Sequence, residues 1–190
     1  GGFNDILFDG QSLLMNKKAI IIDQCPAFVE TSQIMTMNEV KPVEAQSRES
    51  LILDAITYGL KQYMAHAGFS SVLIGCSGGI DSALVAACAV HALGPKQVVL
   101  VTLPSLYNSE ETKNDAYKMA ENLGCKLIHQ SIETYRQQME SDMTKTLSLA
   151  LSDVTKQNIQ SRLRGLMLMT ISNQLSSLLL TTGNKSELAM

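Results

Sequence analysis

The sequence contains no tryptophan, and only four prolines and four cysteines among its 190 residues. The cysteines are Cys25, Cys76, Cys88 and Cys125, which form no C-x-x-C pair and have no metal-ligand spacing. This spacing favours small buried thiols in a reducing compartment over a disulfide framework or a zinc site. No apolar run approaches membrane-spanning length, and the first residues lack the charged-then-apolar order of a signal peptide. We therefore expect a cytoplasmic protein that does not contact membranes.

An excess of positive charge is also missing. The formal net charge is −3, and 17% of the residues are charged against 45% that are hydrophobic. This balance is typical of a globular protein and lacks the basic surface of a nucleic-acid binder, so any polyanionic ligand must be held by local features. The length suits one well-buried core with part of a second domain. Because the chain starts at Gly-Gly and stops where a helix is beginning, we expect both ends to be cut.

The first 40 residues have the pattern of β-structure. The segments "SLLM" and "AIIID" flank Asn16-Lys17-Lys18, which predicts a hairpin, and "QIMTM" at 33–37 predicts a third strand. Residues 41–46 form a polar linker. From Ser47 onward, apolar residues with helical spacing predict a helix that ends near Gly68; they are Ile52, Ile56, Leu60 and Tyr63.

Strand and helix patterns alternate beyond this point, and we place the second domain at 47–190. Short apolar runs predict four strands, at 71–76, 98–103, 126–132 and 177–182. Helices are predicted between them: one up to Gly94, one from the N-cap Ser109 to Gly124, two over 133–175, and a last one from about Asn184. This order is typical of an open parallel α/β sheet with helices on both faces.

The lengths of the connections predict the order of the strands. Two short crossovers step the chain in one direction, whereas the connection over 133–176 is long enough to return and place the fourth strand beside the first. Ligands of open α/β sheets bind at the carboxyl ends of the strands where the order reverses. Residues 77–82 and 182–187 should therefore face the same ligand.

The loop "SGGIDS" at 77–82 has the properties of an anion-binding turn. Its glycines let backbone N–H groups turn inward, two hydroxyls bracket it, and a helix N-terminus follows. It lacks the lysine of a Walker loop and the spacing of a Rossmann fingerprint. Asp81 would repel a pyrophosphate unless Mg²⁺, which takes carboxylate and phosphate oxygens, stood between them. The alternative is a tight turn whose Asp or Ser only caps the helix.

Three motifs carry a family resemblance. The loop resembles the pyrophosphatase loop of the ATP-pyrophosphatase superfamily, which has the adenine nucleotide alpha-hydrolase-like fold. The segment "NIQSRLRGLMLMTISNQLSSLLLTTGNKSE" at 158–187 resembles the matching stretch of NAD synthetases, as does the segment at 103–124. The first ten residues resemble the tail of the nitrilase-like glutaminase domain of glutamine-dependent NAD synthetases, so the β-structure of 1–40 would be a remnant of that domain. The glutaminase nucleophile would lie upstream, and Cys25 matches no such motif.

The resemblance implies roles for individual residues. Asp81 and Glu187 would carry the catalytic Mg²⁺, with Glu187 also near the dinucleotide, and Asn158 and Arg162 would contact deamido-NAD. The residues implied in ATP binding are Gly75, Ser77, Gly78, Gly79, Asp81, Ser82 and Thr182.

Structural alternatives stay open for several of these residues, and neighbouring cations have weaker assignments. Asn158 and Arg162 could form a solvated helix face, and Glu187 could be a first-turn acid favoured by the helix dipole. Arg164 and Lys185 could neutralise phosphate charge. Leu106 stands where many relatives have arginine, so a phosphate contact of that arginine would be missing or moved here.

The activity implied by the resemblance is the ATP-dependent amidation of deamido-NAD, with glutamine or ammonia as the nitrogen source and AMP and pyrophosphate as products. The alternatives are another ATP-pyrophosphatase enzyme, of the GMP-synthetase or tRNA-modifying kind, or a non-catalytic nucleotide-binding module. A tRNA-modifying enzyme would need a basic surface or paired cysteines, which this sequence lacks. Helix faces rich in small and apolar residues favour a homo-oligomer.

Overall fold

The computed structural model describes residues 2–3, 6–37, 40, 46–104 and 110–189. The chain divides into two compact units, residues 1–63 and 64–190. Most of the helix α1 (Arg48–Ala67) belongs to the first unit. The expected boundaries of the domains, with a linker at 41–46, stay a prediction. Within the described ranges, no helix is both long enough and apolar enough to cross a membrane.

The first unit contains short antiparallel strands. Strands β1 (Gly2–Phe3) and β2 (Ile6–Leu7) pair with each other, as do β3 (Leu13–Met15) and β4 (Ile21–Gln24). The β3–β4 hairpin confirms the sequence prediction. Its turn is held by Asn16, whose side-chain oxygen accepts hydrogen bonds from the backbone N–H groups of Lys18 and Ile20 at 2.9 and 3.0 Å.

The third strand predicted at 33–37 was wrong. These residues have no strand conformation, and Ile34 is 90% exposed. Their sequence is rich in apolar residues, but a strand needs a neighbour to pair with, and none of the described strands pairs with this segment.

The predicted helix after Ser47 is confirmed as α1. The Ser47 hydroxyl accepts a hydrogen bond from the N–H of Ser50 at 3.1 Å, and the helix ends before Gly68, whose φ of +76° is the left-handed conformation that glycine adopts freely. Its apolar stripe is not buried in this chain: Ile52 and Tyr63 are 49% and 60% exposed.

The second unit is built on a parallel sheet of four strands: β5 (Val72–Gly75), β6 (Val98–Thr102), β7 (Lys126–His129) and β8 (Leu178–Leu180). Their order is β7-β6-β5-β8, and every neighbouring pair is parallel. The predicted order is confirmed, because β8 lies on the other side of β5 from β6.

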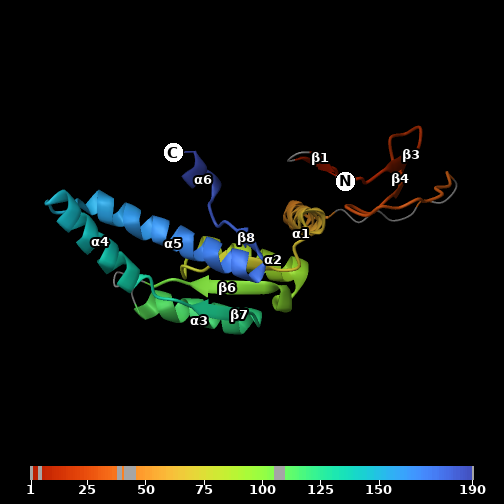
Figure 1. The fold of residues 1–190 in the computed structure, drawn as a ribbon. Coiled ribbons are helices and arrows are strands. Elements are labelled where there is room, and N and C mark those ends of the chain that lie inside the picture. Colours follow the sequence, from red (N-terminus) through yellow and green to blue (C-terminus); the bar gives the residue numbers. More distant parts are fainter. Residues whose placement is uncertain (1, 4–5, 38–39, 41–45, 105–109, 190) are drawn as a thin grey trace. The chain divides into compact units, whose positions relative to one another are not determined.

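The helices of this unit agree with the sequence pattern. They are α2 (Ile80–Leu93), α3 (Glu110–Leu123), α4 (Glu133–Leu147), α5 (Asp153–Leu175) and α6 (Lys185–Leu188), with a 3₁₀ turn at Pro95–Gln97. Because parallel crossovers are right-handed, α2 and α3 cover one face of the sheet and α5, on the returning connection, covers the other. Figure 1 shows α4 and α5 running beyond the sheet as a pair of helices, called the arm below. The N-cap predicted at Ser109 lies outside the described residues.

One core cluster of the sheet domain lies between α5 and the sheet. Leu73, Val101, Leu103 and Ile132 are at most 7% exposed and pack together. Leu168 of α5 is half-buried against this cluster. This cluster therefore includes Val101 and Leu103 at the carboxyl end of β6, so the backbone there is closely packed.

Candidate functional site

The carboxyl ends of β5 and β8 lie side by side. Ile74 is in register with Leu180, and the two strands are parallel. The loop that follows β5 leads to Asp81 in the first turn of α2, and the segment that follows β8 leads to Glu187 in α6. The sheet thus brings the two predicted segments, 77–82 and 182–187, to one edge, as expected of a switch point.

The loop over residues 77–82 is held by its own hydroxyl groups. The Ser82 hydroxyl donates to the carbonyl of Gly79 at 2.9 Å, and the Ser77 hydroxyl accepts from the N–H of Gly79 at 3.2 Å. Gly78 has φ +83°, a left-handed conformation that a residue with a Cβ rarely adopts. Ser82 is only 2% exposed, so it stabilises the turn from below, while Ser77 and Asp81 are exposed.

The N-terminus of α2 behind this loop is open. Its N-cap Gly79 makes no side-chain capping bond. The first N–H groups of a helix have no partner within the helix, and here no cap side chain occupies that position. A backbone donor set of this kind suits phosphate oxygens.

Gly75, predicted to bind ATP, has a packing role that the sequence did not reveal. A Cβ at this position would stand 2.9 Å from Cδ1 of Leu168 and 3.3 Å from its Cδ2. The helix α5 therefore approaches the end of β5 so closely that only glycine fits without a shift. A contact between this residue and ATP stays a prediction.

Cys76, directly before the loop, is not a nucleophile. It is 4% exposed, and burial raises the pKa of its thiol to about 12. Because the thiolate is the reactive form, the protonated Cys76 is inert near neutral pH. Its backbone N–H donates to the carbonyl of Val101 at 2.7 Å, which ties the start of the loop to β6.

Glu187 forms a reciprocal cap with Asn184. The N–H of Glu187 donates to the side-chain oxygen of Asn184 at 3.0 Å, and the N–H of Asn184 donates to Oε2 of Glu187 at 2.9 Å. This geometry agrees with the structural alternative for Glu187, in which the residue is an acid in the first turn of the helix. Thr182 is half-buried in the segment between β8 and this cap. A role of Glu187 toward metal or dinucleotide, and of Thr182 toward ATP, stays a prediction, and the side chain of Lys185 lies outside what the structure describes.

Asn158 and Arg162 line a cavity of about 450 Å³. They lie one turn apart on α5, where Nη1 of Arg162 donates to Oδ1 of Asn158 at 3.0 Å. The other walls are mainly apolar and include Met139 from α4 and Leu163 from α5. A concave, apolar pocket with a few polar groups is the usual form of a small-molecule site. Both side chains are exposed, as on a solvated helix face, so a contact of this pair with deamido-NAD stays a prediction.

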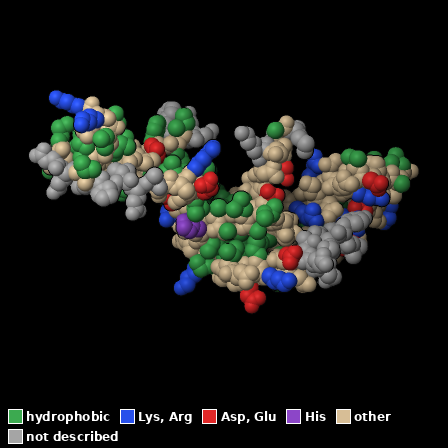
Figure 2. Space-filling view, turned by 180° about the vertical axis from the view of Figure 1, so that it is seen from behind, with side chains coloured by type: hydrophobic (Ala, Val, Ile, Leu, Met, Phe, Trp, Pro, Cys, Tyr) green, Lys and Arg blue, Asp and Glu red, His purple; other side chains and the backbone are tan. Residues whose placement is uncertain are grey.

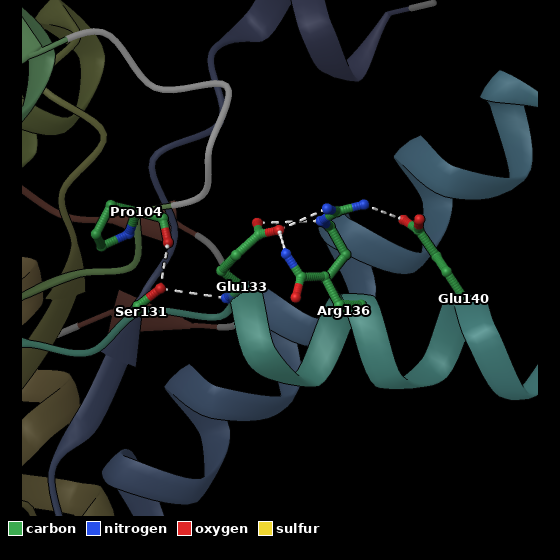
Figure 3. A network of polar contacts seen from close by, with 6 residues as sticks. Pro104, Ser131, Glu133, Arg136 and Glu140 are labelled. Atoms are coloured by element: carbon green, nitrogen blue, oxygen red, sulfur yellow. Dashed lines mark hydrogen bonds and ion pairs between the residues drawn. The ribbon is translucent and has the colours of Figure 1, made fainter.

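The two residues that follow β6, here called the exit of β6, are held by contacts that could not be predicted from the sequence. The carbonyl of Pro104 accepts a hydrogen bond from the hydroxyl of Ser131 at 3.4 Å (Figure 3). It also accepts one from the N–H of Ile132 at 3.3 Å. The carbonyl of Leu103 accepts from Nε of Arg164 at 3.4 Å. Burial lowers the pKa of the Arg164 guanidinium by desolvating its charge. Arg164, one of the two cations that could neutralise phosphate charge, thus donates to the backbone at the carboxyl end of the sheet.

The first turns of α4 carry an ion network that local spacing could have predicted. Arg136, 7% exposed, donates to both carboxylate oxygens of Glu133, at 2.6 and 3.1 Å, and to Glu140 one turn later (Figure 3). The hydrogen bonds with Glu133 and then with Glu140 raise the pKa of the guanidinium. An acid, a base and an acid at i, i+3 and i+7 are the signal for such a network.

The donor set at the sheet edge suits Mg²⁺ better than a tightly caged metal. In the described part of the chain, no group of three or more His, Cys, Asp or Glu residues could hold a metal ion. Mg²⁺ is commonly held by one or two carboxylates together with the phosphates of the substrate. Asp81 and Glu187, which follow neighbouring strands, are carboxylates of the right kind for this arrangement.

Fold and site together define the class of protein: a parallel α/β domain with a glycine-rich loop and a helix N-terminus at the switch point of its sheet, where nucleotide-binding domains hold their ligands. Residues 52–190 match the family model described as NAD synthase. The chain belongs to this family.

Relatives and solved structures agree with this membership. A glutamine-dependent NAD(+) synthetase of Rhodobacter capsulatus is 42% identical over 199 residues, which cover all of this chain and 36% of the relative. The structure of a glutamine-dependent NAD+ synthetase from Acinetobacter baumannii in complex with ADP is 33% identical, with a TM-score of 0.92 over all of this chain and 37% of that chain. An NH3-dependent NAD synthetase from Campylobacter jejuni is 27% identical, with a TM-score of 0.64 over 73% of this chain and 58% of that chain. The chain thus spans little more than a third of its glutamine-dependent relatives. Leu106, where the family resemblance led us to expect an arginine, lies outside the described residues.

Proposed function

We propose that the protein containing this chain amidates deamido-NAD to NAD at the expense of ATP, with nitrogen from glutamine or ammonia. The observation that carries this proposal is the open helix N-terminus behind residues 77–82, located beside the exit of β8 in a chain of the NAD synthase family. The ADP in the similar structure from Acinetobacter baumannii supports an adenine nucleotide as ligand.

In this proposal the two halves of the site hold different substrates. Ser77, Gly78, Gly79 and the N-terminus of α2 hold the phosphates of ATP, with Ser82 supporting the turn and Thr182 reaching the nucleotide from the neighbouring strand. Asp81 and Glu187 hold Mg²⁺, which neutralises phosphate charge when it is bound. Asn158 and Arg162 bind deamido-NAD in the cavity of α4 and α5, where the guanidinium is well suited to a phosphate or carboxylate.

The chemistry requires positioning more than covalent participation of the protein. The nicotinate carboxylate attacks the α-phosphorus of ATP, the bond to the β-phosphate oxygen breaks, and pyrophosphate leaves. Ammonia then adds to the adenylated carboxyl carbon, and AMP leaves with the bonding electron pair as the carboxamide forms. The donors of the loop stabilise the charge that develops on phosphate oxygens, and the cavity orients the carboxylate.

The test is the exchange of labelled pyrophosphate into ATP in the presence of deamido-NAD. We expect Asp81→Asn to lower this exchange by roughly 10²- to 10³-fold, the range typical for loss of one electrostatic contact to a transition state. Asp115→Asn, which changes an exposed carboxylate on α3, is the matched control and should leave exchange unchanged. Near-normal exchange in Asp81→Asn would exclude the metal role, and a wild-type protein without exchange would exclude the function. A non-catalytic nucleotide-binding module would bind ATP and release no pyrophosphate in the same assay.

A homo-oligomer and a cytoplasmic location are further parts of the proposal. Exposed apolar side chains on the arm support packing between copies, among them Leu147 and Leu166 at 53% and 61% exposure. Hydrophobic side chains also gather on one face of the second unit in the view from behind (Figure 2). Sedimentation of the wild type and of Leu147→Glu tests the arm, since the charge should shift the assembly toward monomers and Leu147 does not line the cavity.

A further inference from the structure

The exit of β6 is bracketed by two helices. On one side Arg164 of α5 donates to the carbonyl of Leu103, and on the other Ile132 and Ser131, at the start of α4, donate to the carbonyl of Pro104. Leu103 is only 7% exposed and belongs to the core cluster. We call these five residues the exit bracket. A backbone held at two successive carbonyls beside a packed core has little freedom to move.

The exit bracket connects the two halves of the proposed site. Within β6, the carbonyl of Val101 accepts the N–H of Cys76, the residue that precedes Ser77. Arg164 stands only two residues beyond Arg162, which lines the cavity of the arm. The side chain of Arg164 therefore joins α5, which lines the cavity, to the end of β6, which anchors the loop over residues 77–82, called the phosphate loop below.

A half-buried arginine loses part of the hydration of its charge, and its hydrogen bond to the Leu103 carbonyl must offset that loss of free energy. Arg164 is half-buried, and desolvation destabilises its charged form. An aliphatic side chain would fill the same space without that penalty. A hydrogen bond from a charged donor to a backbone carbonyl is directional, whereas apolar packing is not.

We propose that Arg164 is a positioning residue for the reaction: it fixes the phosphate loop relative to the deamido-NAD cavity by holding the Leu103 carbonyl. This inference rests on the proposed function. Arg164 touches neither substrate in this scheme and acts through Leu103 and β6. Removing it should leave each substrate bound but misaligned, so the rate should fall more than the affinity, since small misplacements of reacting groups cost large factors in rate.

The experiment compares Arg164→Met and Arg164→Lys with the wild type in the full-length protein. We expect kcat for NAD formation to fall about tenfold or more in Arg164→Met while KM for ATP stays within about threefold. Arg164→Lys should recover part of kcat, because an ammonium can still donate to the carbonyl but lacks the fixed planar geometry. Lys156→Met makes the same cation-to-methionine change on α5, at a side chain that is 43% exposed, and should alter kcat by less than about twofold.

Amide hydrogen exchange supplies a readout that does not depend on activity. Loss of Arg164 should speed exchange at the N–H of Ile132, which is bonded to Pro104, more than at Leu73 in the centre of β5. Equal acceleration at both amides, or an unchanged kcat in Arg164→Met, would overturn the positioning role in favour of general stability. A wild-type protein that forms no NAD would overturn the proposed function instead, and the exchange at Ile132 would still report whether the exit bracket exists.

Discussion

Gly75 gives a direct test of how the helix α5 packs on the sheet. In Gly75→Ala the added Cβ would stand 2.9 Å from Cδ1 of Leu168, closer than real Cβ atoms approach their neighbours. Either the leucine must rotate or α5 must move away from β5. Overpacking of this kind costs about 1 to 3 kcal/mol, and we expect the lower half of that range because the obstructing atom is the end of a flexible side chain. For the sheet domain this corresponds to a fall in melting temperature of roughly 3 to 8 °C.

The assay is hydrogen exchange at the amides of β5, which are buried and so report the free energy of opening the sheet. Leu168→Ala removes the two Cδ atoms, so adding Gly75→Ala in that background should cost about 1 kcal/mol less than it does in the wild type. Gly165→Ala is the control on the same helix: its Cβ would meet nothing within 4 Å, and the change should stabilise α5 by roughly 0.5 to 1 kcal/mol. An equal cost of Gly75→Ala in both backgrounds would refute the packing argument.

The same pair of variants separates packing from ligand binding at Gly75. If the glycine is needed only because Leu168 is close, the Leu168→Ala background should restore ATP binding to Gly75→Ala together with stability. If stability returns and ATP binding does not, the residue also contacts the nucleotide, as the sequence resemblance implies.

Two further predictions follow from burial and capping. Burial raises the Cys76 pKa from 9.0 to about 12, so the folded state holds a proton that the unfolded chain releases above pH 9. Stability should therefore fall as pH rises from about 9 to 12, and urea titrations of Cys76→Ala should show a flatter pH dependence than the wild type; parallel curves would contradict this cause. Asn184→Ala removes the acceptor for the N–H of Glu187 and should cost α6 about 1 kcal/mol. Pyrophosphate exchange should fall while global unfolding hardly changes, and wild-type exchange activity would argue against a role of Glu187.

The sheet could be predicted from the sequence because its signals are local. Each strand is a short apolar run, and the length of the connection over 133–176 determines on which side of the first strand the fourth is placed. The prediction of a third N-terminal strand was wrong because pairing of a strand depends on residues elsewhere in the chain. The apolar residues of 33–37 are compatible with a strand, but the segment itself does not determine whether a partner strand lies beside it.

The features of the candidate site also divide into local ones, which the sequence could predict, and long-range ones, which it could not. The loop over 77–82 is contiguous, so its glycines and hydroxyls could be recognised together. Arg164 meets Leu103 across 61 positions of the chain, and Gly75 meets Leu168 across an even longer interval. No spacing rule connects residues so far apart, and the packing of α5 on the sheet alone brings them together. The Arg136 network on α4 is local and could have been predicted.

The helix α5 is the element on which both halves of the site depend. Asn158 and Arg162 line the cavity near its start, Arg164 reaches the end of β6, and Leu168 lies over the end of β5. At 1.5 Å per residue, the first and last of these are roughly 15 Å apart along a single helix. That separation is set by continuous backbone hydrogen bonds, and the Ser152 cap holds the first turn. The proposed reaction, which must bring a carboxylate to a phosphorus atom within a few tenths of an ångström, would depend on such a spacer, because a loop of equal length would fluctuate by more than the reaction tolerates.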